Sequence, residues 1–340
     1  MTMIASNTPI RAMSGSNTVP KRNRDLLTLG ALFVLMIGGL ASLALATGWE
    51  ETIEQIKSLS TWQILVLLAL SLVNYVFRAL RWHLFARRLG LPTSLSQNMR
   101  HFIGGFAMSI TPGRIGELVR MRWLKRETGW SFERTAPLAL IDRASDLIAM
   151  ALILVMAVTL SAASFAQTTP VVLIALIVAF AATRPALVSG LASAAYRICG
   201  IWPRIFARLR RASTSLEKFS KPTVMGLASV LGLIGWLAEA FAFFVLLSWM
   251  GSDIGLWTSV AIFVFATLVG GLIGSPGGIG GAEGAMIGLL LLEGVPMEVS
   301  VPATLIIRIT TLWFAIGIGL AVFPFAERFS NRGAHALENR

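Results

Sequence analysis

Residues 104–122 read GGFAMSITPGRIGELVRMR, and this stretch decides the fold. Thr111, Pro112 and Gly113 predict the start of a helix, because a hydroxyl at the N-cap and a proline at the first helical position are both favoured there. The residues from Phe102 to Ile110, however, are apolar enough to lie in lipid. A helix that begins within an apolar stretch is unusual in a soluble protein. In membrane proteins such a broken or re-entrant helix lines a site.

A second copy of the pattern occurs at residues 270–285, GGLIGSPGGIGGAEGA. The two prolines, Pro112 and Pro276, are 164 residues apart (276 − 112 = 164). The stretch PLALIDR ends at Arg143 and the stretch PATLIIR ends at Arg308, 165 residues later (308 − 143 = 165). Because two separate landmarks share nearly one offset, the sequence predicts an internal duplication.

The composition indicates a polytopic membrane protein. Hydrophobic residues make up 55% of the chain, charged residues only 14%, and the mean hydropathy is +0.74. The net charge of +12 comes from basic residues in short segments between apolar spans, as the positive-inside rule predicts, so we expect no nucleic-acid binding. The single cysteine and the three histidines have no metal-ligand spacing, and we expect neither a metal nor a cofactor.

The apolar segments predict six spans and two hairpins. The predicted spans are Leu26–Thr47, Trp62–Trp82, Pro137–Ser161, Val171–Leu191, Val224–Met250 and Val301–Phe325, and the hairpins lie within 101–122 and 254–292. Both flanks of the first hairpin are basic, so it re-enters from the cytoplasmic face or crosses twice as short helices, and its length favours re-entry because two full crossings need roughly 40 residues. We predict that both termini and the basic segments 83–100, 123–134 and 192–222 lie on the inside. The segments 50–60 and 293–299 are predicted to lie outside.

The second hairpin then enters from outside, so the halves, about 26–165 and 166–325, run in opposite senses. The predicted fold class is an all-α polytopic membrane protein with two inverted-topology repeats, each with a re-entrant or broken helical hairpin. Residues 1–25 are expected to form a disordered cytoplasmic tail. Residues 26–325 form a single transmembrane domain, and 326–340 form a second cytoplasmic tail.

The two hairpin tips are candidate anion sites. The first N–H groups after each proline lack an intrahelical acceptor and lie at the positive end of the helix dipole. The glycines let a ligand approach, or they only allow tight helix packing. The candidate substrate-binding residues in the tips are Thr111, Pro112, Gly113, Arg114, Gly116, Glu117, Ser275, Pro276, Gly277, Gly278, Gly280 and Glu283.

Charged residues inside predicted spans are further candidates, because a charge in the membrane is costly. Arg143 and Asp146 lie three residues apart on one helix face and are predicted to neutralise each other. The counterpart of Asp146 in the second half is Thr311 (146 + 165 = 311), so Arg308 lacks that local partner. It therefore pairs across helices, with Glu239 or Glu283, or binds an anion.

The segments TPGRIGELVR, LALIDRASDL and SPGGIGGAEGA, with the later span of Arg308, resemble the lysylphosphatidylglycerol synthase transmembrane family. This is the flippase-like membrane domain of multiple peptide resistance factors, and the resemblance covers about residues 26–325. It implies an all-helical protein of the bacterial inner membrane that moves lipid between leaflets. We expect no soluble aminoacyl-transferase domain after the last span, so lysine transfer to lipid is not implied.

The favoured hypothesis is a lipid flippase or transporter for an anionic or isoprenoid-linked lipid, with membrane lipids as partners. One alternative is an integral membrane enzyme acting on headgroups, with Glu117, Asp146 or Glu283 as general base. No serine, cysteine or histidine constellation lies near these carboxylates in sequence, so we expect no catalytic residue. The other alternative is an accessory scaffold for a separately encoded lipid-modifying or glycan enzyme. The sequence leaves open the lipid, the direction, the coupling ion and the oligomeric state.

Overall fold

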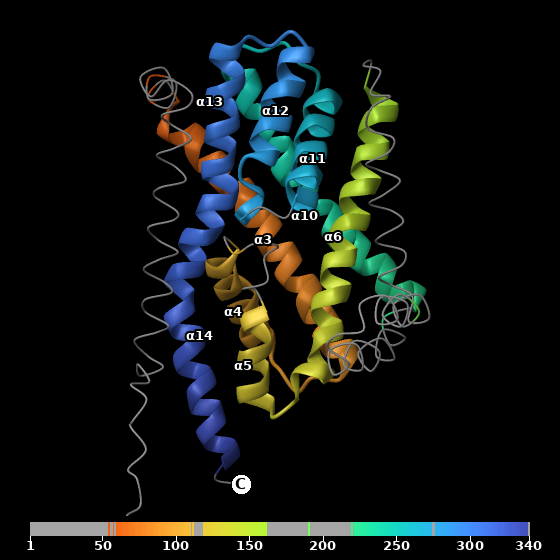
Figure 1. Ribbon diagram of the computed structural model, residues 1–340, viewed down its shortest axis with the longest axis vertical. Coiled ribbons are helices and arrows are strands. Elements are labelled where there is room, and N and C mark those ends of the chain that lie inside the picture. The colour runs from red at the N-terminus through yellow and green to blue at the C-terminus, as the bar shows by residue number, and fades with distance from the viewer. Residues whose placement is uncertain are drawn as a thin grey trace, which may run out of the picture. The chain divides into compact units, whose positions relative to one another are not determined.

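The computed structural model describes residues 54, 57, 59–109, 111, 118–161, 190, 219, 221–273 and 276–338, all within one compact unit, Ser42–Arg340. The regular elements of these residues are helical (Figure 1). They are α3 (Thr61–Leu89), α4 (Leu95–Gly105), the 3₁₀ turn η1 (Phe106–Met108), α5 (Val119–Thr128), α6 (Phe132–Leu160), α10 (Pro222–Trp249), α11 (Leu256–Ile273), the 3₁₀ turn η5 (Pro276–Gly278), α12 (Gly281–Leu292), α13 (Met297–Arg308), the π-helical turn η6 (Ile309–Trp313) and α14 (Phe314–Glu338).

Within the described part of the chain, four helices are long and apolar enough to cross a membrane. They are α3, α6, α10 and the continuous rod Met297–Ala334 formed by α13, η6 and most of α14, and α11 and α12 are shorter apolar helices. The all-helical, polytopic membrane fold that the composition predicts is therefore confirmed. The predicted spans Leu26–Thr47 and Val171–Leu191, and the tail 1–25, lie outside the described residues.

Local sequence signals account for several helix ends. Ser60 and Gln63 form a capping box at the start of α3: the Gln63 N–H donates to Ser60 Oγ over 3.3 Å, and the Ser60 N–H donates to Gln63 Oε1 over 2.7 Å. Ser94 and Gln97 repeat the arrangement at α4. The α3 helix ends at Gly90, whose φ of 91° is the left-handed conformation that favours glycine.

The long and short helices alternate in one order, which occurs twice along the chain. A long helix (α3 or α10) is followed by two short ones (α4 and α5, or α11 and α12) and by another long one (α6, or α13 to α14). In Figure 1 the α4–α5 pair extends from the lower end of the view towards its middle, and the α11–α12 pair extends from the upper end. The long helices α3 and α10 pack side by side and bring the two sets together.

Two clusters of buried apolar side chains hold the described helices together. One lies among α6, α10, α11, α12 and α13 and includes Phe243, Ile262 and Leu290. The other lies among α3, α4, α5 and α10 and includes Trp82 and Phe102. Each hairpin is therefore packed into its own cluster, and α10 contributes to both.

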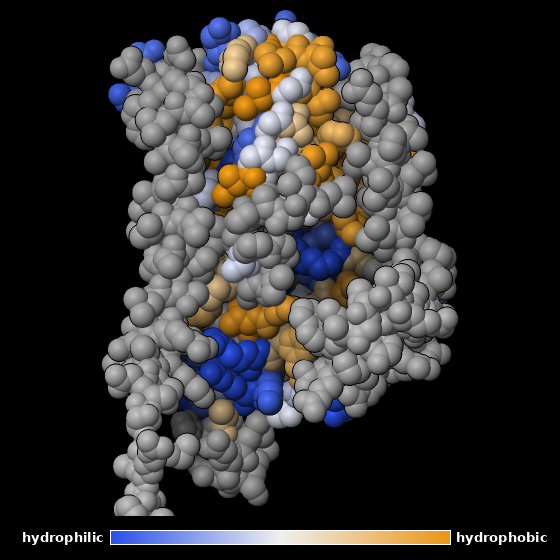
Figure 2. All heavy atoms as spheres, viewed as in Figure 1, coloured by the Kyte–Doolittle hydropathy of each residue, from blue (hydrophilic) through white to orange (hydrophobic). Residues whose placement is uncertain are grey.

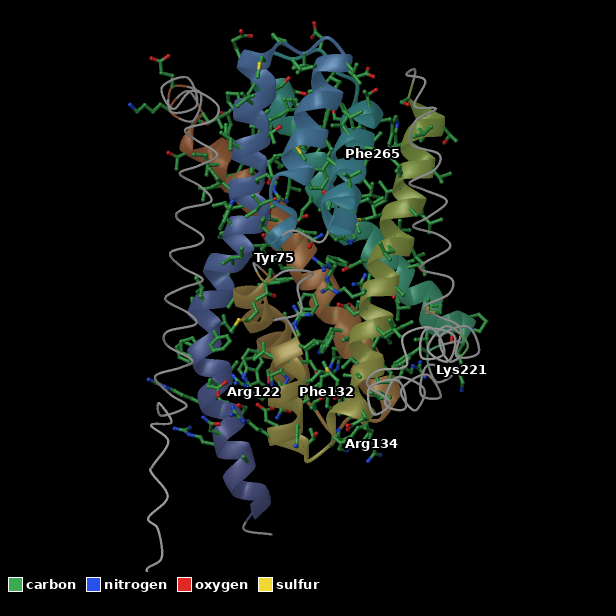
Figure 3. The ribbon with its side chains drawn as sticks, viewed as in Figure 1. Tyr75, Arg122, Phe132, Arg134, Lys221 and Phe265 are labelled. Carbon is green, nitrogen blue, oxygen red and sulfur yellow. The ribbon has the colours of Figure 1, made fainter. Side chains whose placement is uncertain are left out.

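Polar and basic side chains gather at one end of the described helices. In Figure 2 hydrophobic side chains predominate in the upper part of the view, where α11 to α13 lie, below a few hydrophilic ones at its tip, and hydrophilic patches lie near the middle and at the lower end around α5 and α14. The basic residues labelled in Figure 3, which are Arg122, Arg134 and Lys221, lie toward this lower end. The charge asymmetry on which the predicted topology depends is therefore present along the helix axes.

At this end of the helices two carboxylates, Glu327 and Glu127, form hydrogen bonds that connect α5 to its neighbours. Glu327 on α14 accepts hydrogen bonds from Arg122 over 2.8 Å, from Trp123 Nε1 over 2.8 Å and from Arg126. Ser330 also accepts from Arg126, at 3.4 Å. The segment 326–338, predicted as part of a tail, thus forms the helical end of α14 and packs on α5.

Glu127 is the second fastening carboxylate and connects α5 to α4. Its Oε1 accepts a hydrogen bond from Arg100 Nη2 over 2.7 Å and lies 3.1 Å from His101 Nε2, while its Oε2 accepts from Gln97 over 3.1 Å. Burial acts to raise the pKa of Glu127, but the neighbouring His101 and Arg100 outweigh it and hold that pKa below its ordinary value.

The tip of the second hairpin differs from the prediction. Pro276 was expected at the first position of an α-helix with Ser275 as its N-cap, but α12 begins at Gly281, with Gly280 at the N-cap. Pro276 to Gly278 form a 3₁₀ turn instead. Gly277, Gly278 and Gly280 have φ of 64°, 75° and 85°, which interrupts a right-handed helix and delays its start.

Candidate functional site

Four charged side chains form a buried network between α3 and α6. Arg81, whose side chain is inaccessible to solvent, places Nη2 2.7 Å from Asp142 Oδ1 and 2.6 Å from Asp146 Oδ1. Arg78 Nη2 lies 2.8 Å from Asp146 Oδ2, and Trp236 Nε1 on α10 donates to Asp146 Oδ1 over 3.1 Å. The arginines are three residues apart and the aspartates four, so each pair presents one helix face to the other.

The sequence predicted Arg143 as the partner of Asp146, but Arg143 is not its main partner in the structure. Its side chain is 36% exposed, and its nitrogens lie 3.6 Å from Asp142 and 3.7 Å from Asp146. These separations exceed those of Arg78 and Arg81, which approach the same carboxylates from α3. The charge of Asp146 is therefore balanced chiefly across helices and only weakly within α6.

A second buried network joins α13 to the tip of the α11–α12 hairpin. Arg308 Nε donates to Glu283 Oε1 over 2.6 Å, and Arg308 Nη2 donates to the Gly277 carbonyl over 2.8 Å. The other Glu283 oxygen, Oε2, accepts the Gly280 N–H over 2.7 Å. Of the outcomes that the sequence left open for Arg308, the structure shows the pair with Glu283.

This network changes the interpretation of the hairpin tip. Part of the positive end of α12, where an anion was expected, is occupied by the Glu283 carboxylate of the same helix. Arg308 in turn holds both that carboxylate and the turn that contains Gly277. Several of the hydrogen bonds at the second tip are therefore made within the protein itself, and a space that could hold a ligand lies beside Arg308.

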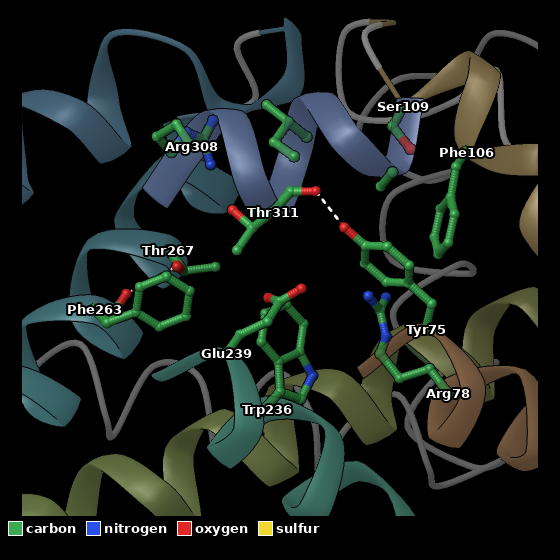
Figure 4. Close-up of a pocket in the computed structure, with 12 residues that line it drawn as sticks. Tyr75, Arg78, Phe106, Ser109, Trp236, Glu239, Phe263, Thr267, Arg308 and Thr311 are labelled. Atoms are coloured by element: carbon green, nitrogen blue, oxygen red, sulfur yellow. Dashed lines mark hydrogen bonds between the residues drawn. The ribbon is translucent and has the colours of Figure 1, made fainter. Parts of the chain in front are cut away.

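That space is a cavity of about 50 Å³ with a mixed polar and apolar lining, at the meeting of α3, η1, α10, α11 and the α13–α14 rod. Figure 4 shows the Glu239 carboxylate, the Tyr75 hydroxyl and the Arg78 guanidinium pointing into it. The volume is sufficient for a few water molecules, each of which needs roughly 10–15 Å³ by this measure. The cavity is lined by Tyr75, Arg78, Phe106, Ser109, Trp236, Glu239, Phe263, Thr267, Arg308, Thr311, Leu312 and Ala315.

The π-helical turn η6 forms one wall of the cavity. A π turn shifts the register of the backbone hydrogen bonds, and such turns occur frequently at functional sites. Here Tyr75 on α3 donates its hydroxyl to the carbonyl oxygen of Thr311 within η6 (Figure 4). This hydrogen bond thus connects η6, which directly follows Arg308 at the end of α13, to α3, which carries Arg78.

The predicted site residues fall into three groups. Glu239 and Arg308 line the cavity; Asp146 and Glu283 lie one contact behind it, bound to Arg78 and Arg308. Arg143 is partly exposed, Thr111 donates its hydroxyl to the Met108 carbonyl over 2.8 Å, and the tip glycines and Pro276 belong to the second hairpin. Outside the described residues are Pro112, Gly113, Arg114, Gly116, Glu117 and Ser275.

Sequence reasoning missed the contribution of α3 to the site. The predicted span Trp62–Trp82 places Arg78 and Arg81 in its last turn, at the basic cytoplasmic end, but both side chains are buried. The helix continues to Leu89, so Arg78 lies 11 residues, or about 16 Å, from its end. The arginine pair at spacing three and the aspartate pair at spacing four are the signal that could have revealed the network.

Comparison with known proteins identifies relatives that match most of the chain. A UPF0104 membrane protein of Methanothermobacter thermautotrophicus is 25% identical over 321 residues, which cover 86% of this chain and 94% of that protein. A second UPF0104 membrane protein of that organism is 28% identical over 123 residues, 36% of each chain. The model of the lysylphosphatidylglycerol synthase TM region matches residues 27–319. This multi-pass membrane protein therefore belongs to the lysylphosphatidylglycerol synthase TM region family.

Proposed function

We propose that the protein is a lipid flippase or transporter that moves an anionic or isoprenoid-linked lipid between leaflets of the bacterial inner membrane. The observation that carries the proposal is the cavity among the apolar helices, whose wall contains the guanidinium groups of Arg78 and Arg308 and the carboxylate of Glu239. Guanidinium groups bind phosphate through paired N–H donors. Charged side chains at such a depth among membrane-length helices are characteristic of a substrate pathway.

We infer that the chain consists of two inverted repeats, and the helix starts support this. Counterpart helices begin at a nearly constant offset: α3 and α10 (222 − 61 = 161), α4 and α11 (256 − 95 = 161), α5 and α12 (281 − 119 = 162), α6 and α13 (297 − 132 = 165). The two hairpins extend from opposite ends in Figure 1. These features favour the arrangement of an inverted-topology transporter.

The repeat also supports the cavity as the binding site. Three pairs of lining residues are related by the α3–α10 offset: Tyr75 and Trp236, Arg78 and Glu239, Phe106 and Thr267 (236 − 75 = 239 − 78 = 267 − 106 = 161). A cavity lined by counterpart positions lies where the two halves meet. Substrate sites of inverted-repeat transporters are located at that interface.

The size of the cavity supports alternating access. About 50 Å³ holds water but not a lipid headgroup, since drug-sized ligand pockets measure roughly 300–1,000 Å³. We infer that the headgroup enters only when the two sets of helices move apart, because the described arrangement leaves too little space for it. The proposal further places both termini in the cytoplasm, names membrane lipids as partners and assigns no catalytic step to the chain.

The proposal is tested in phosphatidylcholine vesicles that contain the purified protein and a trace of fluorescent phosphatidylglycerol or of a fluorescent polyisoprenyl phosphate. Dithionite quenching of the outer leaflet measures lipid movement. The double variant Arg308→Gln/Glu283→Gln removes both members of the buried pair, so no charge is left without its partner. We expect it to lose at least about tenfold of the rate, which corresponds to roughly 1.4 kcal/mol of barrier.

Two comparisons complete the test. Arg308→Lys is expected to retain part of the rate, because a point charge attracts phosphate but lacks the bidentate fork. Arg332→Gln, an exposed arginine near the end of α14, is the control and should move lipid as the wild type does. A fully active double variant would remove Arg308 from the substrate pathway. No movement of either probe by the wild type would contradict the proposed function.

A further inference from the structure

We propose that Glu239 is a proton-binding site, so that the cavity takes up a proton together with an anionic lipid headgroup. The proposal rests on the proposed function and names its coupling ion. The proton adds to the ionised carboxylate, which becomes a neutral carboxylic acid, and it leaves when the headgroup leaves. No other bond forms or breaks.

The position of Glu239 is the first argument. It lies 17 residues after the start of α10 and ten before its end (239 − 222 = 17; 249 − 239 = 10), within one of the apolar membrane-length helices. It is only 6% exposed, and its carboxylate points into the cavity (Figure 4). A carboxylate at this depth in a membrane helix is costly and is characteristic of ion and proton pathways.

The groups that face Glu239 come from the helices packed against α10. From α3 come Tyr75 and Arg78. Behind Arg78 lies the rest of the charged network, which consists of Arg81 of α3 and Asp142, Arg143 and Asp146 of α6. From α13 comes Arg308, with Glu283 of α12 behind it. The residues that α11 contributes to the cavity, Phe263 and Thr267, do not titrate in the physiological range.

The charge balance of the cavity couples the proton to the headgroup. Arg78 lies 2.8 Å from Asp146 and Arg308 lies 2.6 Å from Glu283, so each guanidinium of the wall is already close to a carboxylate. An ionised Glu239 adds a further negative charge that repels an entering phosphate. Because charges interact strongly at low dielectric, protonation of Glu239 removes that repulsion and favours the anion.

A proton fits this site better than a metal cation does. A metal cation would have to approach two guanidinium groups and gather several oxygen ligands around itself. A proton bonds directly to the carboxylate oxygen, and the few waters that about 50 Å³ can hold provide a route to it. The arginines of the wall therefore disfavour a metal ion, and a proton is the cation that we propose for the Glu239 carboxylate.

Thermodynamic linkage gives the proposal a measurable consequence. If protonation favours the anion, then anion binding must favour protonation by the same factor. One linked proton changes the dissociation constant by at most about tenfold per pH unit. The headgroup should therefore bind more tightly at low pH, and only while residue 239 can titrate.

The experiment measures the affinity of the protein, in phosphatidylcholine nanodiscs, for fluorescent short-chain phosphatidylglycerol at pH 5.5 and 7.5. The phosphodiester of this probe remains ionised over that range. For the wild type we expect the Kd to rise by at least about fivefold, and at most about a hundredfold, between the two pH values. Glu239→Gln should bind with a Kd that changes less than about twofold. The control Glu293→Gln, at an exposed carboxylate beyond α12, should keep the wild-type dependence.

A second measurement needs no variant. In weakly buffered solution with a pH indicator, the wild type should take up close to one proton per bound probe. This count decides the question if Glu239→Gln fails to fold, which its thermal unfolding reveals. A full pH dependence in folded Glu239→Gln, or no proton uptake by the wild type, would overturn the proposal and leave the proposed function standing. A wild type that binds the probe at neither pH would contradict the proposed function and the coupling with it.

Discussion

Asp146 shows, at the scale of single residues, how a charge is kept inside an apolar helix bundle. Its carboxylate accepts hydrogen bonds from Arg78, Arg81 and Trp236, which belong to two other helices. Transfer of an ion from water into such a site is repaid only when its hydrogen-bonding capacity is filled. Loss of one partner would leave an uncompensated charge in the interior.

We expect Arg81→Gln to be strongly destabilising and Arg143→Gln to be mild. Breaking a buried pair costs about 3–5 kcal/mol, whereas a partly exposed pair at 3.6–3.7 Å is worth less than about 1 kcal/mol. Tryptophan fluorescence during thermal unfolding in detergent, with the yield of folded protein, measures both. An equal loss in the two variants would show that Arg143 carries the balance of Asp146 after all.

Glu127 predicts an acid-sensitive contact between α4 and α5. Its pKa in the folded protein is held below the ordinary value of 4.5, so the ionised form stabilises the fold. This stabilisation is complete above about pH 4.5 and is lost as the pH falls through the lowered pKa. Thermal unfolding between pH 6 and 3 should show a decline that is shallower in Glu127→Gln. Identical pH profiles for the two proteins would exclude this contribution.

At the scale of helices, the apolar segments predict most of what the structure shows. Trp62–Trp82, Pro137–Ser161 and Val224–Met250 correspond to α3, α6 and α10, because a long apolar run has no other stable form in lipid. The sequence predicted the partner of Arg308 only as one of three alternatives, which were Glu239, Glu283 and a bound anion. A partner such as Glu283 is selected by the three-dimensional path of the hairpin, which periodicity does not contain.

The predictions from the sequence were wrong where short-range and long-range effects compete. A serine and a proline at 275 and 276 predict a helix start, but three glycines with positive φ postpone it to Gly281. The arginines of α3 were interpreted by the positive-inside rule, which applies to flanks. It does not apply to residues that a long helix carries back into the bundle. The cavity, formed by residues from seven helical elements, has no signal in any single segment.

The contact between α14 and the first hairpin predicts a position-specific effect of a small substitution. A Cβ on Gly319 would lie 2.3 Å from the Ala107 backbone nitrogen in η1, whereas one on Gly317 would meet nothing within 4 Å. Gly319→Ala should therefore destabilise the protein by about 1–3 kcal/mol through overpacking. Gly317→Ala should be neutral, or stabilising by up to about 1 kcal/mol. Thermal unfolding compares the two, and equal stability would show that α14 and η1 separate freely.

For the whole molecule, each half depends on the other. The last helix of the second half, α14, packs on α4, η1 and α5 of the first half. On the other side, α10 packs along α3. If the protein moves lipid as proposed, the helices would therefore move in groups that contain members of both proposed repeats.

The predicted membrane topology is a property of the whole molecule that cysteine labelling can test. Single cysteines in place of Lys125 and Glu293, in a Cys199→Ser background, should react with membrane-impermeant maleimide from opposite faces. The basic segment 123–134 is predicted inside, and 293–299 outside. Intact cells should label only position 293, and inverted vesicles only position 125. Labelling of both from one face would overturn the inverted repeat.

The bond between Arg122 and Glu327 also has a consequence for synthesis. Its two residues are 205 positions apart in the chain. A ribosome that adds about 5–20 residues per second needs about 10–40 s to make that distance. Throughout this interval the first hairpin has left the ribosome, while Arg122 and Arg126 still await their carboxylate. The contacts between α5 and α14 can therefore form only after the last helix has been made.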